Sequence, residues 1–557
     1  MNESYETTLL GVKNYSVAAQ LPFHYILLDS WWYYRGDSGN VDIWDMRPTV
    51  FPRGLGHFAS ATGWSYQLHC GQQWSPQTHY STRNGGAYNF VHDGSPTVVP
   101  DSQAFWDDLL ANKTKDGMLT YEMDWMNDQM HQSKSMLTNA TLGRTWLMQV
   151  DSGARKANVT VQMCMTLVRQ LLQSVEMRSV TNARASNDYH PSNDQWECIG
   201  TTSILTHALG IAPSKDSYWS TTAVQTGSHW GDNVREAHSE LEAVVASLTT
   251  GPVATSDKIG HSNSSLILRS CDASGRLLTP DMPARELDAH FAAKAHLAFG
   301  KNDRSLESDA CNIEDNTDFQ GNDLGSAHRN VSSPGACCAL CAATKGCRFF
   351  TYLNQPGYEH YCSLKTSDKH KVSAAGHVSG SPHATPEPEP AVGVDGHLQG
   401  TSVTLNGWKT SYVLAVAVAS TYNLSMAELG YTASTKLVAV ETHDPSSVRP
   451  VTAGLDIVPC GLSDLQLWTT APLLGDSGWA LLGEPDKWVS VSRQRFANLT
   501  ANKDGASVTV TGAAGESVAV DWWSETKGQQ RIHCKLGAAG TALVAVGGAT
   551  GGACTPA

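Results

Sequence analysis

Two short segments decide the fold of this chain: Met118–Trp125, with the sequence MLTYEMDW, and Val180–Pro191, with the sequence VTNARASNDYHP. Each runs from apolar or β-branched residues into an acid beside an aromatic, at Asp124-Trp125 and at Asp188-Tyr189. Parallel strands of a barrel end at the same edge, so two such strands would bring their carboxylates together. The chain has 53 Asp and Glu residues, however, and most are expected to be helix caps or solvated loop residues. The pattern therefore needs support from the rest of the sequence.

Composition narrows the class of protein. A length of 557 residues predicts two to four domains, and 41% hydrophobic with 17% charged residues is typical of a globular chain. The net charge of −14 and the lack of a long Lys/Arg run argue against a nucleic-acid partner. The most apolar stretch, Tyr412–Ser420, is too short to span a membrane and alternates like a sheet strand.

The cysteines and sequons point to an oxidising compartment. Six of the 13 cysteines lie between Cys311 and Cys362. Sequons at nine asparagines fit the same compartment: Asn2, Asn14, Asn112, Asn139, Asn158, Asn263, Asn330, Asn423 and Asn498. No signal peptide is visible at the N-terminus. We expect a secreted or lumenal protein (endomembrane, vacuolar or extracellular) whose given N-terminus is incomplete.

Strand and helix patterns alternate over the first 280 residues. An apolar run at 23–32 ends in Asp29 and two tryptophans, and later runs at 64–69, 159–165 and 251–257 also end in polar groups. Helical patterns are expected at 4–20, 164–175 and 233–249. This alternation predicts a (β/α)8 TIM barrel over residues 1–300, with an open doubly wound sheet as the competitor. No dinucleotide-binding or P-loop motif follows a strand, so the sequence supports neither dinucleotide binding nor a P-loop nucleotide site.

Five motifs carry a family resemblance. They are Asp29-Ser30-Trp31, Phe51-Pro52-Arg53-Gly54-Leu55, Met123-Asp124, Arg184-Ala185-Ser186-Asn187-Asp188-Tyr189 and Gly251-Pro252-Val253-Ala254-Thr255-Ser256-Asp257-Lys258. Their order resembles that of α-galactosidases and raffinose-synthase-like glycoside hydrolases of the melibiase type. The last motif, followed by Gly260 and Asp272–Leu278, looks most like raffinose synthases. The resemblance covers most of residues 20–290.

The resemblance implies a role for several residues. Asp124 would be the strand-four nucleophile and Asp188, four residues after Arg184 at the end of strand six, the acid/base. The first-strand acid, Asp29, would contact sugar hydroxyls. The further substrate-binding candidates are polar groups at strand ends and aromatic rings that would wall the sugar site: His69, Glu122, Asp216, Asp257, Trp31, Trp32, Trp125 and Trp219.

Two positions depart from the family pattern. Leu28 stands where relatives have the first of two acids, and Glu122 stands where they have a Lys two residues before the nucleophile. Both positions contact the sugar in relatives, so these departures bear on which sugar is bound. Glu122 either adds negative charge beside Asp124, raising a pKa of the pair, or faces the other side of the strand in a salt bridge.

The region 301–383 changes character and becomes rich in cysteine. Adjacent cysteines and an even count favour disulfides over a zinc site. The pattern Cys337-Cys338-Ala339-Leu340-Cys341, then Cys347–Tyr352, then Cys362–Lys365 resembles a PAN/apple domain. Such modules commonly bind protein or carbohydrate, which predicts a docking role; the alternative is a passive, disulfide-stapled spacer.

The last part of the chain is predicted to be all-β. Residues 384–393 form a Pro/Glu-rich linker, and short alternating segments from 394 to 557 predict an antiparallel β-sandwich. Gly483–Trp488 and Ser492–Phe496 resemble the C-terminal β domain of the same hydrolases, which packs on the barrel. Cys534 pairs with Cys554, or either pairs with Cys460.

The expected activity is that of a retaining glycosidase acting on an α-linked, galactoside-like sugar in an oligosaccharide or glycoconjugate. The carboxyl groups of a retaining pair, here Asp124 and Asp188, would lie about 5 to 5.5 Å apart, against roughly 6.5 to 9.5 Å for an inverting pair. No cofactor or metal is expected. One alternative is a raffinose-synthase-like galactosyl transferase, in which a sugar hydroxyl replaces water. The other is a non-catalytic glycan-binding protein. Relatives carry an N-terminal β-sandwich, so either this member lacks it or the sequence is a fragment.

Overall fold

The computed structural model describes residues 4–36, 39–82, 85–193, 196–228, 230–292, 311–325, 327–355, 360–382, 396–547 and 551–557. The chain forms two compact units. The first comprises residues 1–287 together with 396–557, and the second comprises residues 288–395. The linker predicted at 384–393 lies outside the described residues.

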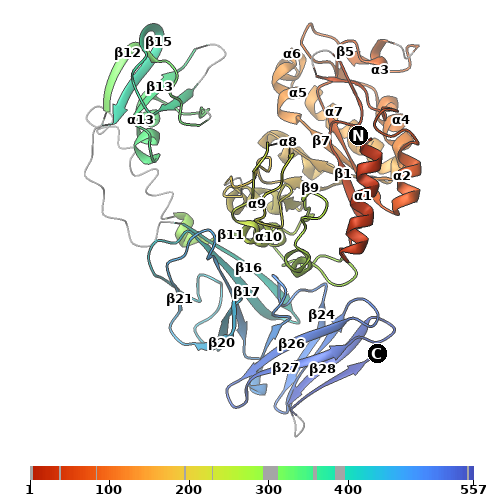
Figure 1. Ribbon diagram of the computed structural model, residues 1–557, viewed down its shortest axis with the longest axis vertical. Helices are drawn as coiled ribbons and strands as arrows, with labels where there is room; N and C mark the ends of the chain where they lie inside the picture. The colour runs from red at the N-terminus through yellow and green to blue at the C-terminus, as the bar shows by residue number, and fades with distance from the viewer. Residues whose placement is uncertain are drawn as a thin grey trace. The chain divides into compact units, whose positions relative to one another are not determined.

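Six parallel strands form the centre of the first unit (Figure 1). In spatial order they are β1 (Tyr25–Leu28), β4 (Ser65–Gly71), β7 (Met118–Asp124), β8 (Thr160–Met163), β9 (Val180–Arg184) and β10 (Ala212–Ser214). The predicted α/β fold class is therefore confirmed as a parallel half-barrel of six strands. Asp124 ends the third of these strands, not the fourth.

The remainder of the expected eight-stranded barrel is not built as a ladder in the described residues. Beyond β10 one parallel bridge joins Tyr218 to Thr255. Pro213 and Pro252 stand in these segments and have no backbone N–H to donate, which limits strand pairing there. Gly251 lies so close to β10 that an added Cβ would be 2.3 Å from the carbonyl oxygen of Pro213.

Helices accompany the parallel strands. Two of them, α4 (Gln103–Thr114) and α7 (Leu142–Ala157), pack on each other, and they contact β7 and β8 respectively. The helices predicted at 4–20, 164–175 and 233–249 are observed as the shorter α1 (Tyr5–Ala18), α8 (Val168–Gln173) and α10 (Ser239–Ser247). The others are α2 (Leu55–Thr62), α3 (His79–Thr82), α5 (Met126–Gln132), α6 (Lys134–Thr138), α9 (Ile199–Ala208), α11 (Ser264–Ile267) and the 3-10 turns η1 (Ser174–Glu176) and η2 (Leu268–Ser270). Two small antiparallel pairs complete this part: β2 (Tyr34–Arg35) with β3 (Val41–Ile43), and β5 (Phe90–Val91) with β6 (Val99–Pro100).

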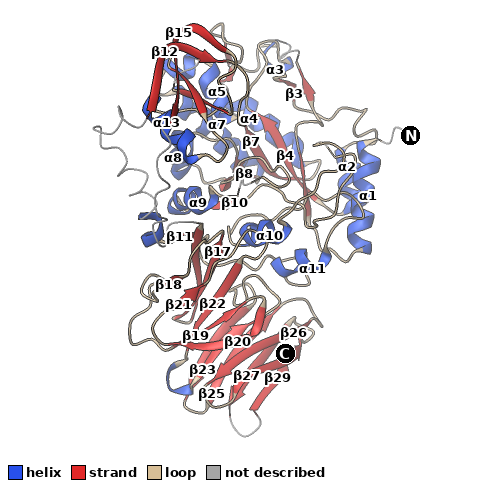
Figure 2. Ribbon diagram, turned by 60° about the vertical axis from the view of Figure 1, so that its left-hand side comes forward, coloured by secondary structure: helices blue, strands red, loops and turns tan. Residues whose placement is uncertain are grey.

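Antiparallel strands make up the C-terminal part of the first unit (Figure 2). One sheet has the order β11 (Arg285–Glu286), β16 (His397–Leu405), β17 (Trp408–Val416), β22 (Gln466–Pro472), β19 (Leu437–Glu441) and β20 (Asp444–Val451). A second has β24 (Phe496–Asn502), β25 (Gly505–Thr511), β28 (Thr541–Gly547) and β29 (Gly551–Pro556); a third has β23 (Trp479–Gly483), β26 (Ser517–Ser524) and β27 (Gly528–Lys535). The pair β18 (Tyr422–Leu424) and β21 (Leu455–Ile457) and the turn η3 (Gly475–Ser477) complete it.

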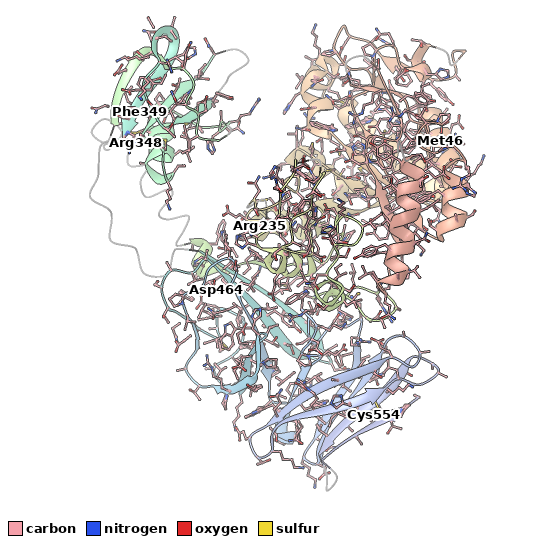
Figure 3. The ribbon with its side chains drawn as sticks, viewed as in Figure 1. Met46, Arg235, Arg348, Phe349, Asp464 and Cys554 are labelled. Atoms are coloured by element: carbon pink, nitrogen blue, oxygen red, sulfur yellow. A yellow bond between two sulfur atoms is a disulfide. The ribbon has the colours of Figure 1, made fainter. Side chains whose placement is uncertain are left out.

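The alternation read from the sequence matches the burial of these strands. In β25, Ala506, Val508 and Val510 are buried while their neighbours are half-exposed. A disulfide joins Cys534 in β27 to Cys554 in β29, whose position is labelled in Figure 3. This is one of the pairings left open by the sequence, and Cys460 carries a free thiol.

The parallel and antiparallel parts of the first unit share a hydrophobic core. Leu241 and Val244 of α10 are buried in one cluster with Leu414 and Trp488. The ammonium group of Lys487 donates to the carbonyl oxygens of Leu268 and Cys271, both at 2.7 Å. The antiparallel sheets are thus packed directly on the half-barrel.

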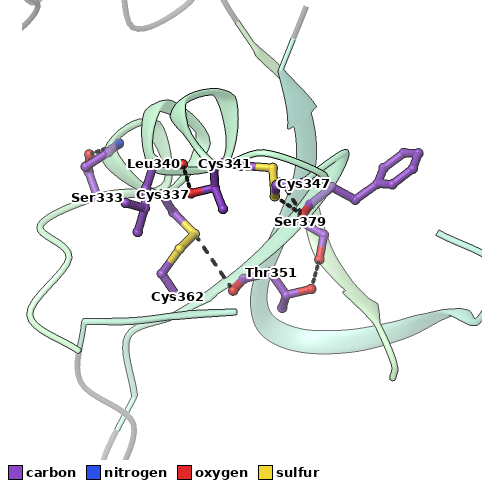
Figure 4. Close-up of a disulfide and its surroundings, with 11 residues drawn as sticks. Ser333, Cys337, Leu340, Cys341, Cys347, Thr351, Cys362 and Ser379 are labelled. Atoms are coloured by element: carbon purple, nitrogen blue, oxygen red, sulfur yellow. Dashed lines mark hydrogen bonds between the residues drawn. A yellow bond between two sulfur atoms is a disulfide. The ribbon is translucent and has the colours of Figure 1, made fainter. Parts of the chain in front are cut away.

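In its described residues from 311 to 382, the second unit contains a small four-stranded sheet with a helix packed on it. The strand order is β12 (Cys311–Phe319), β15 (Lys371–Pro382), β13 (Phe349–Leu353) and β14 (Tyr361–Lys365), and α13 (Pro334–Ala343) packs on it. Three disulfides hold it together: Cys311–Cys338, and the pairs Cys337–Cys362 and Cys341–Cys347, which Figure 4 shows. All six cysteines are therefore in disulfides and not available as zinc ligands. No helix in the described part of the chain is long and apolar enough to cross a membrane.

Candidate active site

The carboxyl ends of the parallel strands open into a cavity of about 1170 Å³. Residues from every strand of the half-barrel, or from the loops that follow them, line it. Nine of the twelve residues proposed from the sequence are among them: Asp29, His69, Glu122, Asp124, Trp125, Arg184, Asp188, Asp216 and Asp257.

Asp124, the last residue of β7, is buried at the inner end of this cavity with a side chain only 10% exposed. The backbone N–H of Trp125 donates to its Oδ1 (2.8 Å), and His69 Nε2 lies 2.8 Å from its Oδ2. Burial alone would raise the pKa of Asp124, but the hydrogen bond and charge of His69 and the Trp125 N–H outweigh it and lower the pKa. Asp124 is therefore ionised, which is the form a nucleophile requires.

His69 connects Asp124 to the rest of the cavity wall. It lies on β4, its Nε2 is also 3.7 Å from Asp29 Oδ1, and its Nδ1 is 3.3 Å from the hydroxyl of Tyr33. Burial alone would lower the pKa of His69. The hydrogen bond to Asp124 and the charges of Glu122 and Asp29 outweigh burial, so its pKa is raised.

Glu122 shares the cavity face of β7 with Asp124, because residues two apart on a strand point to the same side. Its carboxylate accepts from the side-chain amides of Gln67 (3.3 Å) and Gln162 (3.1 Å), and Asn182 donates to Gln162 Oε1 (2.6 Å). The salt bridge on the far side of the strand is therefore wrong. Burial, reinforced by the charge of Asp124, raises the pKa of Glu122 to about 7 despite the opposing charge of His69.

Arg184 organises the other acids. Its Nη2 donates to Asp188 Oδ1, and its Nη1 lies 3.8 Å from Asp216 Oδ1. The Asp188 side chain is 65% exposed, whereas the Asp216 side chain is 24% exposed and accepts from the Tyr189 N–H at 2.6 Å. Asp188 is the acid of this group that is open to solvent.

Asp257 lines the cavity, but its carboxylate accepts hydrogen bonds from the 220–225 loop. Its two oxygens accept from the backbone N–H (2.8 Å) and the hydroxyl (2.6 Å) of Ser220, and Gln225 donates to it at 3.4 Å. These contacts hold the 220–225 loop and leave Asp257 less available to a sugar than Asp29.

The aromatic wall differs from the one expected from the sequence. Trp31, Trp32 and Trp219 lie away from the cavity, since Trp31 stacks on Tyr5 (ring centroids 4.6 Å apart) and the other two are buried in the core. Trp125 is the one tryptophan of the four that lines the cavity. The sequence does not single out four other lining residues: Tyr33, Gln67, Gln162 and Trp230. Polar glutamines inside otherwise buried strands were an available signal for two of them.

Comparisons with known proteins find a family model that matches the second unit and solved structures that resemble most of the chain. Residues 317–365 match the family model described as "PAN domain". The second unit contains a PAN domain. Over 84% of its length, the chain is similar in structure to a GH27 β-L-arabinopyranosidase from Geobacillus stearothermophilus, of which the match covers 93%, with a TM-score of 0.50 and 11% identity. The resemblance to melibiase-type hydrolases therefore holds at the level of fold.

Two further solved structures have TM-scores below 0.5. A variant of the same arabinopyranosidase in complex with arabinose has a TM-score of 0.49 and 12% identity, covering 84% of this chain and 94% of that one. A xylosidase from Aspergillus niger has a TM-score of 0.39 and 10% identity, covering 84% and 62%. No curated protein matches the chain.

Proposed function

We propose that this chain is a retaining glycosidase that cleaves α-D-galactopyranoside-like sugars, with Asp124 as nucleophile and Asp188 as acid/base. The observation that carries the proposal is an ionised, buried Asp124 in one cavity with a solvent-open Asp188 held by Arg184. A buried carboxylate suits attack on the anomeric carbon, whereas an acid/base must exchange protons with solvent.

In the first step the Asp124 carboxylate bonds to the anomeric carbon while the bond to the leaving oxygen breaks, and protonated Asp188 gives its proton to that oxygen. In the second step Asp188, now a carboxylate, takes a proton from water as the water oxygen attacks the anomeric carbon. Asp124 then leaves as a free carboxylate, and the configuration of the sugar is retained.

The sugar is proposed from chemistry shared with the similar structure. A β-L-arabinopyranoside and an α-D-galactopyranoside have the same arrangement of ring hydroxyls and differ by the hydroxymethyl group at C5. Asp29 and Glu122 line the cavity beside Asp124 and supply carboxylate oxygens that can accept from such hydroxyls.

The test compares p-nitrophenyl α-D-galactopyranoside and β-L-arabinopyranoside on wild type, Asp124→Ala, Asp188→Asn and the exposed control Asp476→Asn. Asp124→Ala should abolish turnover, Asp188→Asn should lower kcat by roughly 10²- to 10⁴-fold, and the control should match wild type. A 2-fluoro glycoside should label Asp124 in a peptide mass map. If no α-glycoside is turned over, the proposal that the protein is an enzyme is wrong, and the alternative of sugar binding without catalysis is favoured.

The transferase alternative is separated by product analysis. With an acceptor sugar present, a hydrolase releases mainly free sugar, whereas a transferase forms a new oligosaccharide. We further propose a secreted or lumenal location, because four disulfides are stable in an oxidising compartment. The PAN domain would then bind a glycan or protein ligand, tested by glycan-array binding of the full chain.

A further inference from the structure

Three carboxylates converge on one imidazole at the inner end of the cavity. Asp124 and Glu122 come from β7, Asp29 follows β1, and His69 stands on β4, paired in register with Glu122. His69, Glu122 and Asp124 are each less than 8% exposed. Buried carboxylates side by side repel one another unless a cation or a proton lies between them.

Among the described residues, the Lys and Arg side chains that line the cavity each lie against another side chain, and Arg35 is over the Tyr33 ring, 5.8 Å from its centroid. Arg184 is held by Asp188 and Asp216, and Lys215 is paired with Glu242 at 2.5 Å. Besides the backbone N–H of Trp125, His69 places a nitrogen within hydrogen-bond distance of Asp124, at 2.8 Å, and of the two groups only His69 can carry a charge. Position 122 carries an acid, so β7 itself supplies no positive charge next to Asp124.

The surroundings of His69 accommodate its doubly protonated form. The Tyr33 oxygen accepts from the Gly71 N–H (3.2 Å) and lies 3.3 Å from His69 Nδ1. A phenol oxygen has two lone pairs, so it can accept from both of these donors while His69 Nε2–H donates to Asp124. The raised pKa of His69 agrees with this assignment.

We propose that His69 is a positioning residue whose imidazolium keeps Asp124 ionised and aimed for attack, in place of a cation on β7. This inference rests on the proposed function. The groups that face His69 are Asp29, Tyr33, Glu122 and Asp124, while Arg184 acts on Asp124 from β9.

The first test is the pH profile of kcat/KM for His69→Gln, with the exposed His57→Gln as the matched control. Glutamine can still donate to Asp124 but carries no charge. The acid limb of the profile should therefore move up by about one pH unit or more, because Asp124 loses its cationic partner. Tyr33→Phe should move the limb in the same direction by less, and His57→Gln should not move it. A uniformly lower profile with an unmoved acid limb would overturn the proposal.

The second test needs no turnover. In protein labelled with ¹⁵N-histidine, the imidazole signal missing from His69→Gln identifies His69, and its titration is followed in wild type and Asp124→Asn. We expect titration above pH 6.5 in wild type and a lower midpoint in Asp124→Asn. A midpoint at or below 6.5 that Asp124→Asn leaves unchanged contradicts the positioning role. If no glycoside is cleaved but this titration behaves as expected, the proposed function fails and the pairing of His69 with Asp124 stands.

Discussion

Trp125 holds a left-handed backbone conformation, with φ 58°, directly after Asp124. This conformation is unfavourable for a bulky side chain and persists where the surroundings enforce it. Here it turns the chain from β7 into α5 and directs the Trp125 N–H back to Asp124. The indole remains 38% exposed and lines the cavity, so one residue both hydrogen-bonds Asp124 and presents a flat apolar face on which the sugar of the proposed function would stack.

Replacing Trp125 by Gly should separate these two effects. Glycine adopts the left-handed conformation freely, so the melting temperature should hold or rise. Loss of the ring should raise KM about tenfold, the equivalent of about 1.4 kcal/mol of stacking. Thr250→Gly, which relieves a left-handed residue (φ 74°) outside the cavity lining, is the control and should leave KM unchanged. A lower melting temperature with unchanged KM would contradict the binding role.

Some site residues could be predicted from the sequence and others could not. Asp124 and Asp188 each follow a strand pattern, but they were singled out because they stand in register with the other motifs of the family resemblance. The contact of His69 with Asp124 depends on the register of β4 against β7, which no local pattern encodes. The prediction that Trp32 and Trp219 line the cavity was wrong, because tertiary packing decides whether an aromatic side chain faces the core or a cavity, and no local pattern shows it.

At the scale of elements, a buried ion triad ties the antiparallel sheets to the half-barrel. Arg495, 1% exposed, bonds Glu484 (Nε to Oε2, 2.5 Å) and Glu516 (Nη2 to Oε1, 2.6 Å). Glu516 Oε1 also accepts from the Ala273 N–H of the half-barrel at 3.1 Å. The triad therefore links the end of β23, the residue before β24, the turn before β26 and a loop of the parallel part.

Arg495→Leu should destabilise the first unit by about 3 to 5 kcal/mol, because it leaves two buried carboxylates without their cation. Arg493→Leu, a neighbouring change at a side chain 64% exposed, should have almost no effect. Thermal unfolding of both variants beside wild type measures the difference. Equal melting temperatures for the two variants would show that the triad contributes nothing.

His443 forms a second link, between Glu240 of α10 (2.8 Å) and Glu441 of β19 (2.9 Å). Hydrogen bonds to these acids raise the pKa of His443 to about 9. Because the folded pKa is raised, the stabilisation is complete below about pH 6.5 and is lost as pH rises through about 9. The side chain is 38% exposed, so solvent screening limits the effect to under about 1 kcal/mol.

His443→Gln should therefore lower the melting temperature at pH 6 and not at pH 10. The exposed His533→Gln, which makes no such link, serves as the control and should show no pH-dependent difference from wild type. A His443→Gln deficit that is the same at both pH values would contradict the charge contribution.

The elements themselves were easier to predict than their limits. Each predicted helix proved shorter than its pattern, as at 164–175, where Met165 has φ 48° and breaks the helix before α8 begins. A further strand was predicted from the apolar run at 251–257, but that segment forms one bridge and no ladder, and Pro252 within it has no N–H to donate. The periodicity of apolar residues indicates which side chains are buried, but it does not indicate which backbone N–H and C=O groups are hydrogen-bonded.

At the scale of the whole molecule, the second unit is an insertion in the first. β11 and β16 flank residues 288–395 and pair antiparallel, with Arg285 opposite Gly400. The Leu287 N–H donates to the Leu398 carbonyl at 2.8 Å, so the chain leaves and re-enters the sheet at neighbouring positions. The sequence predicted a disulfide module and did not predict this nesting, since a two-residue strand such as β11 has no periodic signal.

Replacing residues 289–396 by Asn-Gly should give a folded protein, because this dipeptide closes antiparallel pairs with a tight turn. We expect kcat and KM for an aryl glycoside to match the full chain. Removing residues 285–396 also deletes β11 and should lower the melting temperature. Loss of small-substrate turnover in the shorter deletion would show that the insert takes part in catalysis.

The paired ends of the insertion also bear on how such a chain can change over evolution. Doubling the length of the chain between two joined strand ends costs only about 0.6 kcal/mol of loop-closure free energy. The stability of the sheet therefore depends little on the length of the inserted segment. A recombination event at this junction could exchange the inserted domain for another without altering the half-barrel. The β11–β16 pair is thus a junction at which the chain could acquire a different domain while the rest of its first unit stays the same.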